Sequence, residues 1–345
     1  MPFNVPGMPR LRLSIAWRYG LLTAAWLIVI TLLHFRLNMP HESRQLVRMG
    51  YMPVVTNLAA PLLDHVSRDK GDYRYQAIKF ASFAEMAESL RNGHIDAAFM
   101  IAPLAIVLRQ QGEDVHIIYI GNRHESTLVA RKDLAIRDIG GLAGHTVAVP
   151  MRYSGHNLGM LRVMEDLGMP GAINIVEMNP PDMASALASG ALDAYFVGEP
   201  FAAQTIVSGD AQVVNYVEDI WPQFICNLVI VRQDFIEKRS KAVQQLVQTA
   251  MRSGIWAEGH PDEAAAIASG YWNQPPDLIR YALTTPKNRI QYHHAVPQIA
   301  EIQQMADLMV RYHLIDDNDI DGLVEDRFAR DADLEGITDV SSILR

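Results

Sequence analysis

The chain has 345 residues, of which 49% are hydrophobic and 20% are charged, and its formal net charge is −9. This composition supports a sizeable core and excludes general disorder. It also disfavours a nucleic-acid binder, because no basic excess is available to neutralise phosphates. The single cysteine, Cys226, excludes an intramolecular disulfide, a thiolate zinc cluster and a Cys-x-x-Cys redox centre.

The charge is unevenly distributed along the chain. Residues 1–45 carry five arginines and one glutamate, whereas the remainder is acidic. Within this basic region, residues 19–35 carry no formal charge apart from His34. As a helix this run would be about 26 Å long at ~1.5 Å per residue, close to the ~30 Å hydrocarbon core of a bilayer. We therefore predict a basic segment at 1–18 and a transmembrane signal-anchor helix at 19–35, which places the body on the periplasmic or extracellular side of the cytoplasmic membrane.

Two other interpretations of the apolar run stay open. A cleaved secretory signal would need a shorter apolar region and a small-x-small site, neither of which the sequence offers near Phe35. A buried soluble helix would rarely be apolar on every side at a chain terminus. The orientation signal is weak, because Arg36, Arg44 and Arg48 follow the run.

The body contains an internal repeat. Residues 86–105 and 183–202 align without a gap at an offset of 97, and nine of the twenty positions are identical. In the first copy, Phe83, Met86, Ala87 and Leu90 form one apolar stripe of a helix. A glycine follows in each copy, where a helix end needs a left-handed residue, and then comes a short apolar run typical of a buried strand. The repeat predicts two similar α/β lobes.

Further elements follow the same scheme in chain order. A first strand is expected at 46–51, strands at 115–120 and 128–130, a loop and strand at 142–150 that open the second lobe, and a helix after residue 157. A return strand at 228–231 precedes several helices. We predict lobe 1 at 46–126 with return helices within 228–330, lobe 2 at 127–227, and a C-terminal tail at 331–345.

An ordered set of motifs resembles one known family. The set comprises Ala60-Pro61-Leu62-Leu63, Gly93-x-Ile95-Asp96, the run Gly144–Pro150, and Arg232-Gln233-Asp234-Phe235-Ile236. It is similar to the nitrate/sulfonate/bicarbonate class of ABC-importer substrate-binding proteins, which includes binders of thiamine-precursor pyrimidines. The resemblance covers about residues 46–328. It implies a type II periplasmic-binding-protein fold with mixed, mostly parallel sheets in two lobes, which close on a small solute and deliver it to an ABC permease and ATPase.

The expected ligand contacts lie where strands end at the carboxyl edge of each sheet, because ligands of open α/β sheets bind there. A polar cluster at a helix start offers free N–H groups and the positive end of the helix dipole, although an ordinary N-cap has the same residues. Glu199 replaces Ala102 of the first repeat, and a carboxylate there would favour a solute bearing an amine or hydroxyl group. The predicted ligand-binding residues are Thr56, Asn57, Ala102, Pro103, Ser126, Ser154, Gly155, His156, Asn157 and Glu199.

The sequence therefore predicts a binding protein rather than an enzyme, with no cofactor, no metal and no nucleic acid partner. One alternative is an enzyme like the thiamine-pyrimidine synthases of the same family, for which Lys79 is the main candidate to hold a pyridoxal cofactor. Another is a membrane-tethered solute sensor.

Overall fold

A computed structural model describes residues 14–38 and 44–345, so that residues 1–13 of the expected basic segment lie outside the described part. The chain divides into two units, Met1–Gln45 and Leu46–Arg345. The described part of the first unit contains the helix α1 (Ile15–Asn38). Its stretch Ile15–Arg36 is long and apolar enough to cross a membrane, and its large hydrophobic side chains, such as Trp17 and Trp26, are exposed. A signal sequence would share these properties.

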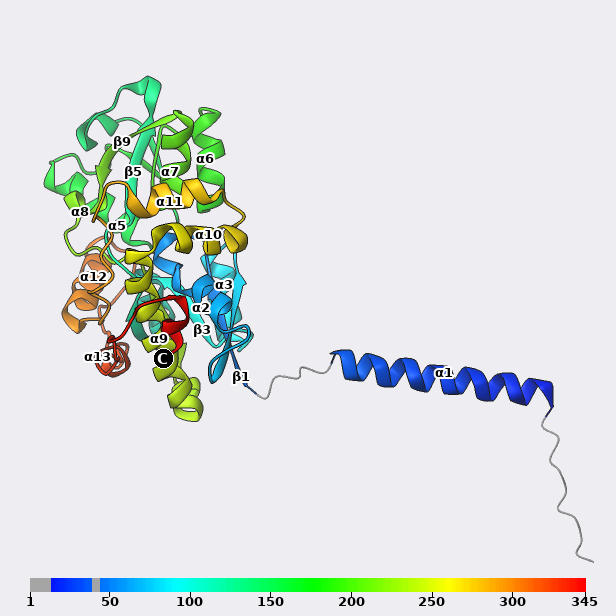
Figure 1. Ribbon diagram of the computed structural model, residues 1–345. Coiled ribbons are helices and arrows are strands. Elements are labelled where there is room, and N and C mark those ends of the chain that lie inside the picture. The colour runs from blue at the N-terminus through cyan, green and yellow to red at the C-terminus, as the bar shows by residue number, and fades with distance from the viewer. Residues whose placement is uncertain (1–13, 39–43) are drawn as a thin grey trace, which may run out of the picture. The chain divides into compact units, whose positions relative to one another are not determined.

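The second unit is built on two five-stranded mixed sheets with the same topology (Figure 1). The first sheet has the order β2-β1-β3-β10-β4, and the second has the order β7-β6-β8-β5-β9. We call each sheet with its covering helices lobe 1 and lobe 2, respectively. The strands are β1 Gln45–Tyr51, β2 Tyr73–Lys79, β3 Ala97–Ile101, β4 Val115–Ile120, β5 Ser126–Arg131, β6 Thr146–Val149, β7 Asn174–Glu177, β8 Ala194–Gly198, β9 Ala211–Tyr216 and β10 Asn227–Arg232.

The central strand of each sheet comes from the sequence repeat, as predicted. β3 pairs in parallel with β1 and antiparallel with β10, while β8 pairs in parallel with β6 and antiparallel with β5. Every residue of β3 and β8 is buried. The preceding helices end near Gly93 and Gly190, whose φ angles of 71° and 80° lie in the left-handed region that favours glycine. The two-lobed α/β fold is confirmed.

The remaining elements cover the sheets. The helices of the two lobes are α2 Ala59–Val66, α3 Phe83–Arg91, α4 Ala102–Gln110, α5 Gly155–Asp166, α6 Pro180–Ala188, α7 Phe201–Ser208 and α8 Val217–Ile220. The C-terminal helices are α9 Gln233–Gly259, α10 Pro261–Trp272, α11 Pro276–Thr284, α12 Ile299–Arg311 and α13 Arg327–Arg330. Short 3₁₀ turns are η1 Val55–Asn57, η2 Lys132–Leu134, η3 Ile139–Leu142 and η4 Val340–Leu344.

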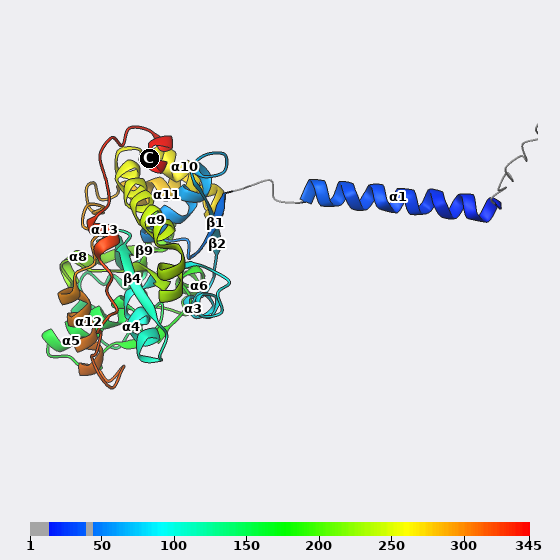
Figure 2. The same cartoon turned by 90° about the horizontal axis from the view of Figure 1, so that it is seen from below.

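The C-terminal helices bridge the two lobes. α9 packs on β4 and β10 of lobe 1, whereas α11 contacts α7 and α12 contacts α5 in lobe 2. Both views place α12 beside α5 (Figures 1 and 2). The tail after residue 331 lies against α9, because the buried Arg252 guanidinium donates to the carbonyl oxygens of Ser342, Asp333 and Glu335. The predicted residue bounds of the lobes and the tail stay predictions.

Candidate ligand-binding site

Two chain passages join the lobes at the carboxyl ends of their central strands. The first runs from the end of β4 to the start of β5, and the second leads from α8 into β10. They pair with each other at Arg123 and Ile225. The lobes also meet directly, because the Val55 N–H donates to the Glu199 carbonyl oxygen at 2.7 Å. The loops that follow β1 and β8 are therefore brought together.

A cluster of buried polar side chains fills this junction, and we call it the inter-lobe cluster. All its members are less than 5% exposed. They come from both lobes and both passages: Thr56, Asn57, Glu125, Ser126, Thr127, His156, Glu199, Cys226 and Asn227. Buried polar groups cost free energy unless they are hydrogen-bonded, so a set of this size at one junction points to a functional site.

His156 lies at the centre of the inter-lobe cluster. Its Nε2 is 2.9 Å from Ser126 Oγ and 3.9 Å from Cys226 Sγ. Its ring packs edge-on against the rings of Phe196 and Phe224, with centroids 4.9 Å and 5.3 Å away. Burial lowers the pKa of His156 to about 3, so the imidazole is neutral at physiological pH. Within residues 14–38 and 44–345, its Nδ1 has no hydrogen-bond partner.

The two glutamates are coupled through the backbone. The Glu199 N–H donates to Glu125 Oε2 at 2.7 Å. Glu199 accepts from the Thr127 hydroxyl at 2.8 Å and from the Ala203 N–H, in the first turn of α7, at 2.7 Å. Both of its carboxylate oxygens are thus occupied, which makes Glu199 a positioning residue for α7 and β5. Burial raises the pKa of Glu199 to about 7 and also raises the pKa of Glu125.

The predicted residues of lobe 1 belong to the inter-lobe cluster or lie at the start of α4. The Asn57 amide donates to the Met52 carbonyl oxygen, and its Oδ1 accepts from the Asn227 amide at 2.8 Å. The Thr56 hydroxyl is buried, and among the described residues it has no hydrogen-bond partner. The Ala102 N–H donates to the Cys226 carbonyl oxygen, which fixes the start of α4. Pro103 is buried in the first turn of α4.

The start of α5 brings its four predicted residues to the junction. Ser154 caps the helix, since its Oγ accepts from the Asn157 N–H at 3.1 Å. The Asn157 amide donates to the Arg152 carbonyl oxygen, so two of the four side chains serve local structure. Gly155 is required by packing, because a Cβ there would lie 2.7 Å from the Phe224 ring. His156 is the member of this group that reaches the other cluster residues.

Sequence reasoning missed three residues of the inter-lobe cluster and an arginine that contacts it. Glu125, Cys226 and Asn227 lie on the two passages, and Arg289 comes from the segment after α11. Arg289 pairs with Glu218 at 2.9 Å, donates to the Thr127 hydroxyl at 3.0 Å and contacts the Ser126 carbonyl oxygen. The sequence signal for Glu125 was its place directly before Ser126 and Thr127, two hydroxyl residues that precede an expected strand. Arg289 had none, because only the folded chain brings it near Ser126.

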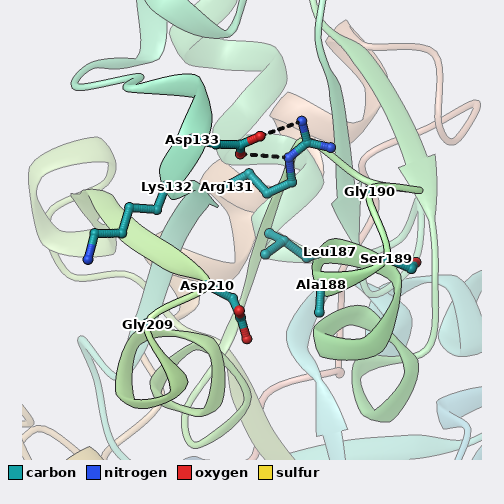
Figure 3. Close-up of a pocket in the computed structure, with 9 residues that line it drawn as sticks. All are labelled: Arg131, Lys132, Asp133, Leu187, Ala188, Ser189, Gly190, Gly209 and Asp210. Atoms are coloured by element: carbon teal, nitrogen blue, oxygen red, sulfur yellow. Dashed lines mark hydrogen bonds and ion pairs between the residues drawn. The ribbon is translucent and has the colours of Figure 1, made fainter.

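Two hollows differ in their relation to this junction. One, of about 260 Å³, lies between the lobes and is lined by Ser82, Phe83, Ala84, Pro150, Met151, Glu177, Met178 and Asn179. It is tied to the start of α5 through Arg152, whose N–H donates to Glu177 and whose carbonyl oxygen accepts from Asn157. The other hollow, of about 580 Å³, belongs to lobe 2 alone, where Arg131 pairs with Asp133 beside Gly190 and Asp210 (Figure 3).

Metal or nucleophile chemistry finds little support here. Within the described ranges 14–38 and 44–345, no group of three or more His, Cys, Asp or Glu side chains could hold a metal ion. Cys226 is buried, and burial together with Glu125 raises the pKa of its thiol well above the usual range. A thiol that stays protonated is a poor nucleophile.

The fold and the inter-lobe cluster define a two-lobed α/β protein of the periplasmic-binding type. The chain belongs to the NMT1-like family, whose model matches residues 41–270, more than half of the sequence.

Three known proteins show what the chain is similar to. The taurine-binding periplasmic protein of Escherichia coli is 26% identical over 50% of this chain and 54% of its own length. A nitrate/nitrite binding protein of Nostoc is 22% identical over 74% of this chain and 64% of its own. This chain therefore spans less than two thirds of either relative. An alkanesulfonate-binding protein from Xanthomonas axonopodis, solved with MOPS, has the same fold, with a TM-score of 0.69 at 19% identity over 82% of this chain and 99% of its own.

Proposed function

We propose that the protein is the solute-binding component of an ABC importer and clamps a small anionic or organic solute of the nitrate/sulfonate class between its lobes. The observation that carries this proposal is the inter-lobe cluster, in which buried polar side chains from two sheets of equal topology converge. The names of the relatives, which bind taurine, nitrate and alkanesulfonates, support the solute class. An ABC permease and ATPase would be the partners.

Closure would act as a hinge at the two passages. Thr56 and Asn57 approach the solute from lobe 1, and Ser126 and His156 approach it from lobe 2. The start of α5, with Ser154, Gly155 and Asn157, adds the positive end of a twelve-residue helix, which stabilises an anionic group. Ala102 and Pro103 shape the opposite wall at the start of α4. A solute that contacts both lobes favours the closed state by its differential affinity for that state.

The hollow between the lobes would hold the organic part of such a solute. Its lining is mainly apolar, with Phe83, Met151 and Met178 among its residues. Methionine side chains adapt to irregular apolar shapes. Glu177 on the same lining disfavours a second anionic group at this end. A sulfonate with an aliphatic or amine-bearing substituent therefore fits better than a solute with two acidic ends.

The proposed importer component would be held at the membrane by α1, with the body on the periplasmic or extracellular side. The length and composition of Ile15–Arg36 support an anchor, and a signal sequence is the competing interpretation. A tethered binding protein would remain near its permease, and a sensory role would use the same anchor.

An enzyme of the thiamine-pyrimidine-synthase type has less support. Lys79 is exposed at the end of β2, and its ammonium group donates to the Tyr271 carbonyl oxygen at 3.2 Å. The relatives compared above are named as binding proteins. A colourless purified protein without a bound cofactor is the expected result for a binding protein.

Thermal unfolding of the full chain with added solutes tests the proposal. The panel is nitrate, bicarbonate, taurine, alkanesulfonates of increasing length and aminopyrimidines. A solute present at 100 times its Kd should stabilise the protein by about 2.7 kcal/mol. A His156→Phe variant, which keeps a ring but removes both nitrogens, should lose that stabilisation. If no solute of the panel raises the unfolding temperature, the proposed function is wrong.

A further inference from the structure

Three buried side chains form a continuous hydrogen-bonded chain in the inter-lobe cluster. Ser126 Oγ lies 3.0 Å from Glu125 Oε1 and 2.9 Å from His156 Nε2. Each of the three residues is at most 1% exposed. A hydroxyl group has one hydrogen to donate and two acceptor lone pairs, so Ser126 can only accept from His156 when it donates to Glu125. When Ser126 accepts from Glu125, its hydrogen is free for His156 Nε2.

The Glu199 backbone fixes where a proton can sit on Glu125. Its N–H donates to Glu125 Oε2, and an N–H cannot accept. A proton on Oε2 would weaken that hydrogen bond, whereas a proton on Oε1 can be donated to Ser126, so we place the Glu125 proton on Oε1.

The three hydrogen-bonded side chains can therefore adopt two protonation states. With Glu125 ionised, Ser126 donates to Oε1 and accepts from the His156 Nε2–H, which leaves Nδ1 without a hydrogen. With Glu125 protonated, Oε1–H donates to Ser126, Ser126 donates to Nε2, and Nδ1 carries the hydrogen. The second state has one proton more: a proton is taken up at Nδ1, the Nε2 proton passes to Ser126, and the Ser126 proton passes to Glu125.

The far end of this hydrogen-bonded series, His156 Nδ1, has no partner of its own among the described residues. In the described part of the chain, His156 Nδ1 is a buried atom with no hydrogen-bond partner, although the ring is neutral and must present either a donor or an acceptor there. A buried polar atom of this kind is normally satisfied. A solute between the lobes is the partner that the proposed function supplies.

We propose that Glu125, acting through Ser126, sets whether His156 Nδ1 accepts or donates a hydrogen bond, and thereby which solutes the cleft selects. This inference rests on the proposed function, because it takes His156 to contact the solute. Ionised Glu125 selects solutes that present an N–H or O–H group, such as the ammonium group of taurine. Protonated Glu125 selects solutes that present an oxygen without a hydrogen, such as nitrate.

Other titratable groups lie next to Glu125 and His156 and could affect their protonation. Glu125 is faced by Cys226, Glu199, Arg289 and Tyr292. Burial raises the pKa values of Cys226 and Tyr292, so both of these groups stay protonated across the range of the experiment. Glu199 titrates nearby, because its pKa is about 7. His156 contacts the uncharged rings of Phe196 and Phe224.

A Glu125→Gln variant fixes the direction of the hydrogen bonds that join residue 125, Ser126 and His156. The Glu199 N–H requires an acceptor, so the amide oxygen takes the place of Oε2 and the amide NH₂ group faces Ser126. The Ser126 hydrogen is then free for His156 Nε2, so we expect Nδ1 to carry the hydrogen at every pH. The variant therefore mimics protonated Glu125 without a change of shape.

Nitrogen NMR of the full chain in detergent micelles, with ¹⁵N-labelled histidine, reads the tautomer directly. A His156→Asn variant assigns the signal, and the remaining histidine signals report that the fold is intact. In the wild type the tautomer should change from Nδ1–H to Nε2–H as the pH rises and Glu125 ionises; burial raises the pKa at which this happens. E125Q should keep Nδ1–H up to pH 8.5, and Glu199→Gln should keep the transition. Identical tautomers in the wild type and E125Q at pH 8.5 would overturn the proposal.

Calorimetric titration with taurine and with nitrate then tests the selectivity. Between pH values on either side of the tautomer change, the ratio of their affinities should change about tenfold in the wild type, since one buried hydrogen bond reverses. It should stay constant in E125Q at its pH 5 value. An unchanged ratio in the wild type contradicts the selectivity. If neither taurine nor nitrate binds, selection between them is contradicted, whereas the proposed function is contradicted only if no solute of the panel binds. The NMR experiment tests the hydrogen bonds of Glu125, Ser126 and His156 in either case.

Discussion

At the scale of single residues, Gly155 shows how closely the start of α5 approaches the Phe224 ring. A Cβ atom there would lie 2.7 Å and 2.9 Å from two carbons of the Phe224 ring. We expect Gly155→Ala to lower the free energy of unfolding by about 1–3 kcal/mol, because an extra methyl group in a packed site displaces its neighbours. Urea unfolding followed by circular dichroism measures this change.

Gly159 provides the matched control in the same helix. A Cβ atom there would meet its neighbours at 3.5 Å and 3.6 Å, which is ordinary contact. Gly159→Ala should leave the stability unchanged or raise it by up to about 1 kcal/mol through helix propensity. Equal losses in both variants would contradict the role given to the Gly155 contact.

Glu199 makes stability depend on pH. Its folded pKa of about 7 lies above the ordinary value of 4.5, because burial disfavours the ionised form. The folded chain therefore holds its proton more tightly than the unfolded chain, so this stabilisation is complete below pH 4.5 and is lost as the pH rises through 7. We expect the free energy of unfolding to fall by up to about 3 kcal/mol between pH 5 and pH 8.

The control for this pH dependence is Glu199→Gln. The amide accepts from Ala203 and donates to Thr127, as protonated Glu199 would, and it does not titrate. The decline of stability from pH 5 to pH 8 should be smaller in this variant than in the wild type. Equal slopes in urea unfolding at pH 5, 6, 7 and 8 would show that Glu199 ionises at its ordinary pKa.

The residues at the helix start were predictable from sequence to an unequal degree. Ser154 followed by an apolar run indicates an N-cap, and the structure has that cap. His156 could be placed at the start of α5, but its contact with Ser126 joins positions 30 residues apart and depends on the packing of the lobes. Local patterns fix a helix end, whereas the partners of a buried side chain depend on the whole fold.

At the scale of elements, the repeat was the most informative feature. It predicted the helix, glycine turn and buried strand of both copies, because these follow from apolar periodicity and from the left-handed glycine. The segment between α11 and α12 was not predicted. Its Arg289 holds the start of β5 through Ser126 and Thr127, and no periodic pattern indicates such a contact.

The helix α1 predicts where in the cell the protein is found. Its stretch Ile15–Arg36 should insert as a transmembrane helix and hold the protein in the membrane fraction. We expect the full chain to resist extraction by alkaline carbonate, whereas a chain that begins at residue 44 should stay in the soluble fraction. A mature protein whose first residue lies near position 40 would instead identify α1 as a cleaved signal.

At the scale of the whole molecule, two sheets of equal topology share one buried polar junction. The sequence indicated two similar halves and a cleft between them, because a repeated helix and strand unit at an offset of 97 residues implies two similar lobes. It could not indicate how the C-terminal helices bridge the halves, because α11 and α12 contact lobe 2 through surfaces that have no counterpart in the repeat.

Hydrogen exchange measured with and without a stabilising solute tests the clamp between the lobes most directly. The clamp predicts slower exchange of backbone amides in four segments, namely 55–57, 122–127, 154–157 and 199–203, because these segments surround the inter-lobe cluster. Amides around the hollow of Arg131 and Asp210 should exchange as before. Protection confined to that hollow, with no change between the lobes, would contradict the account.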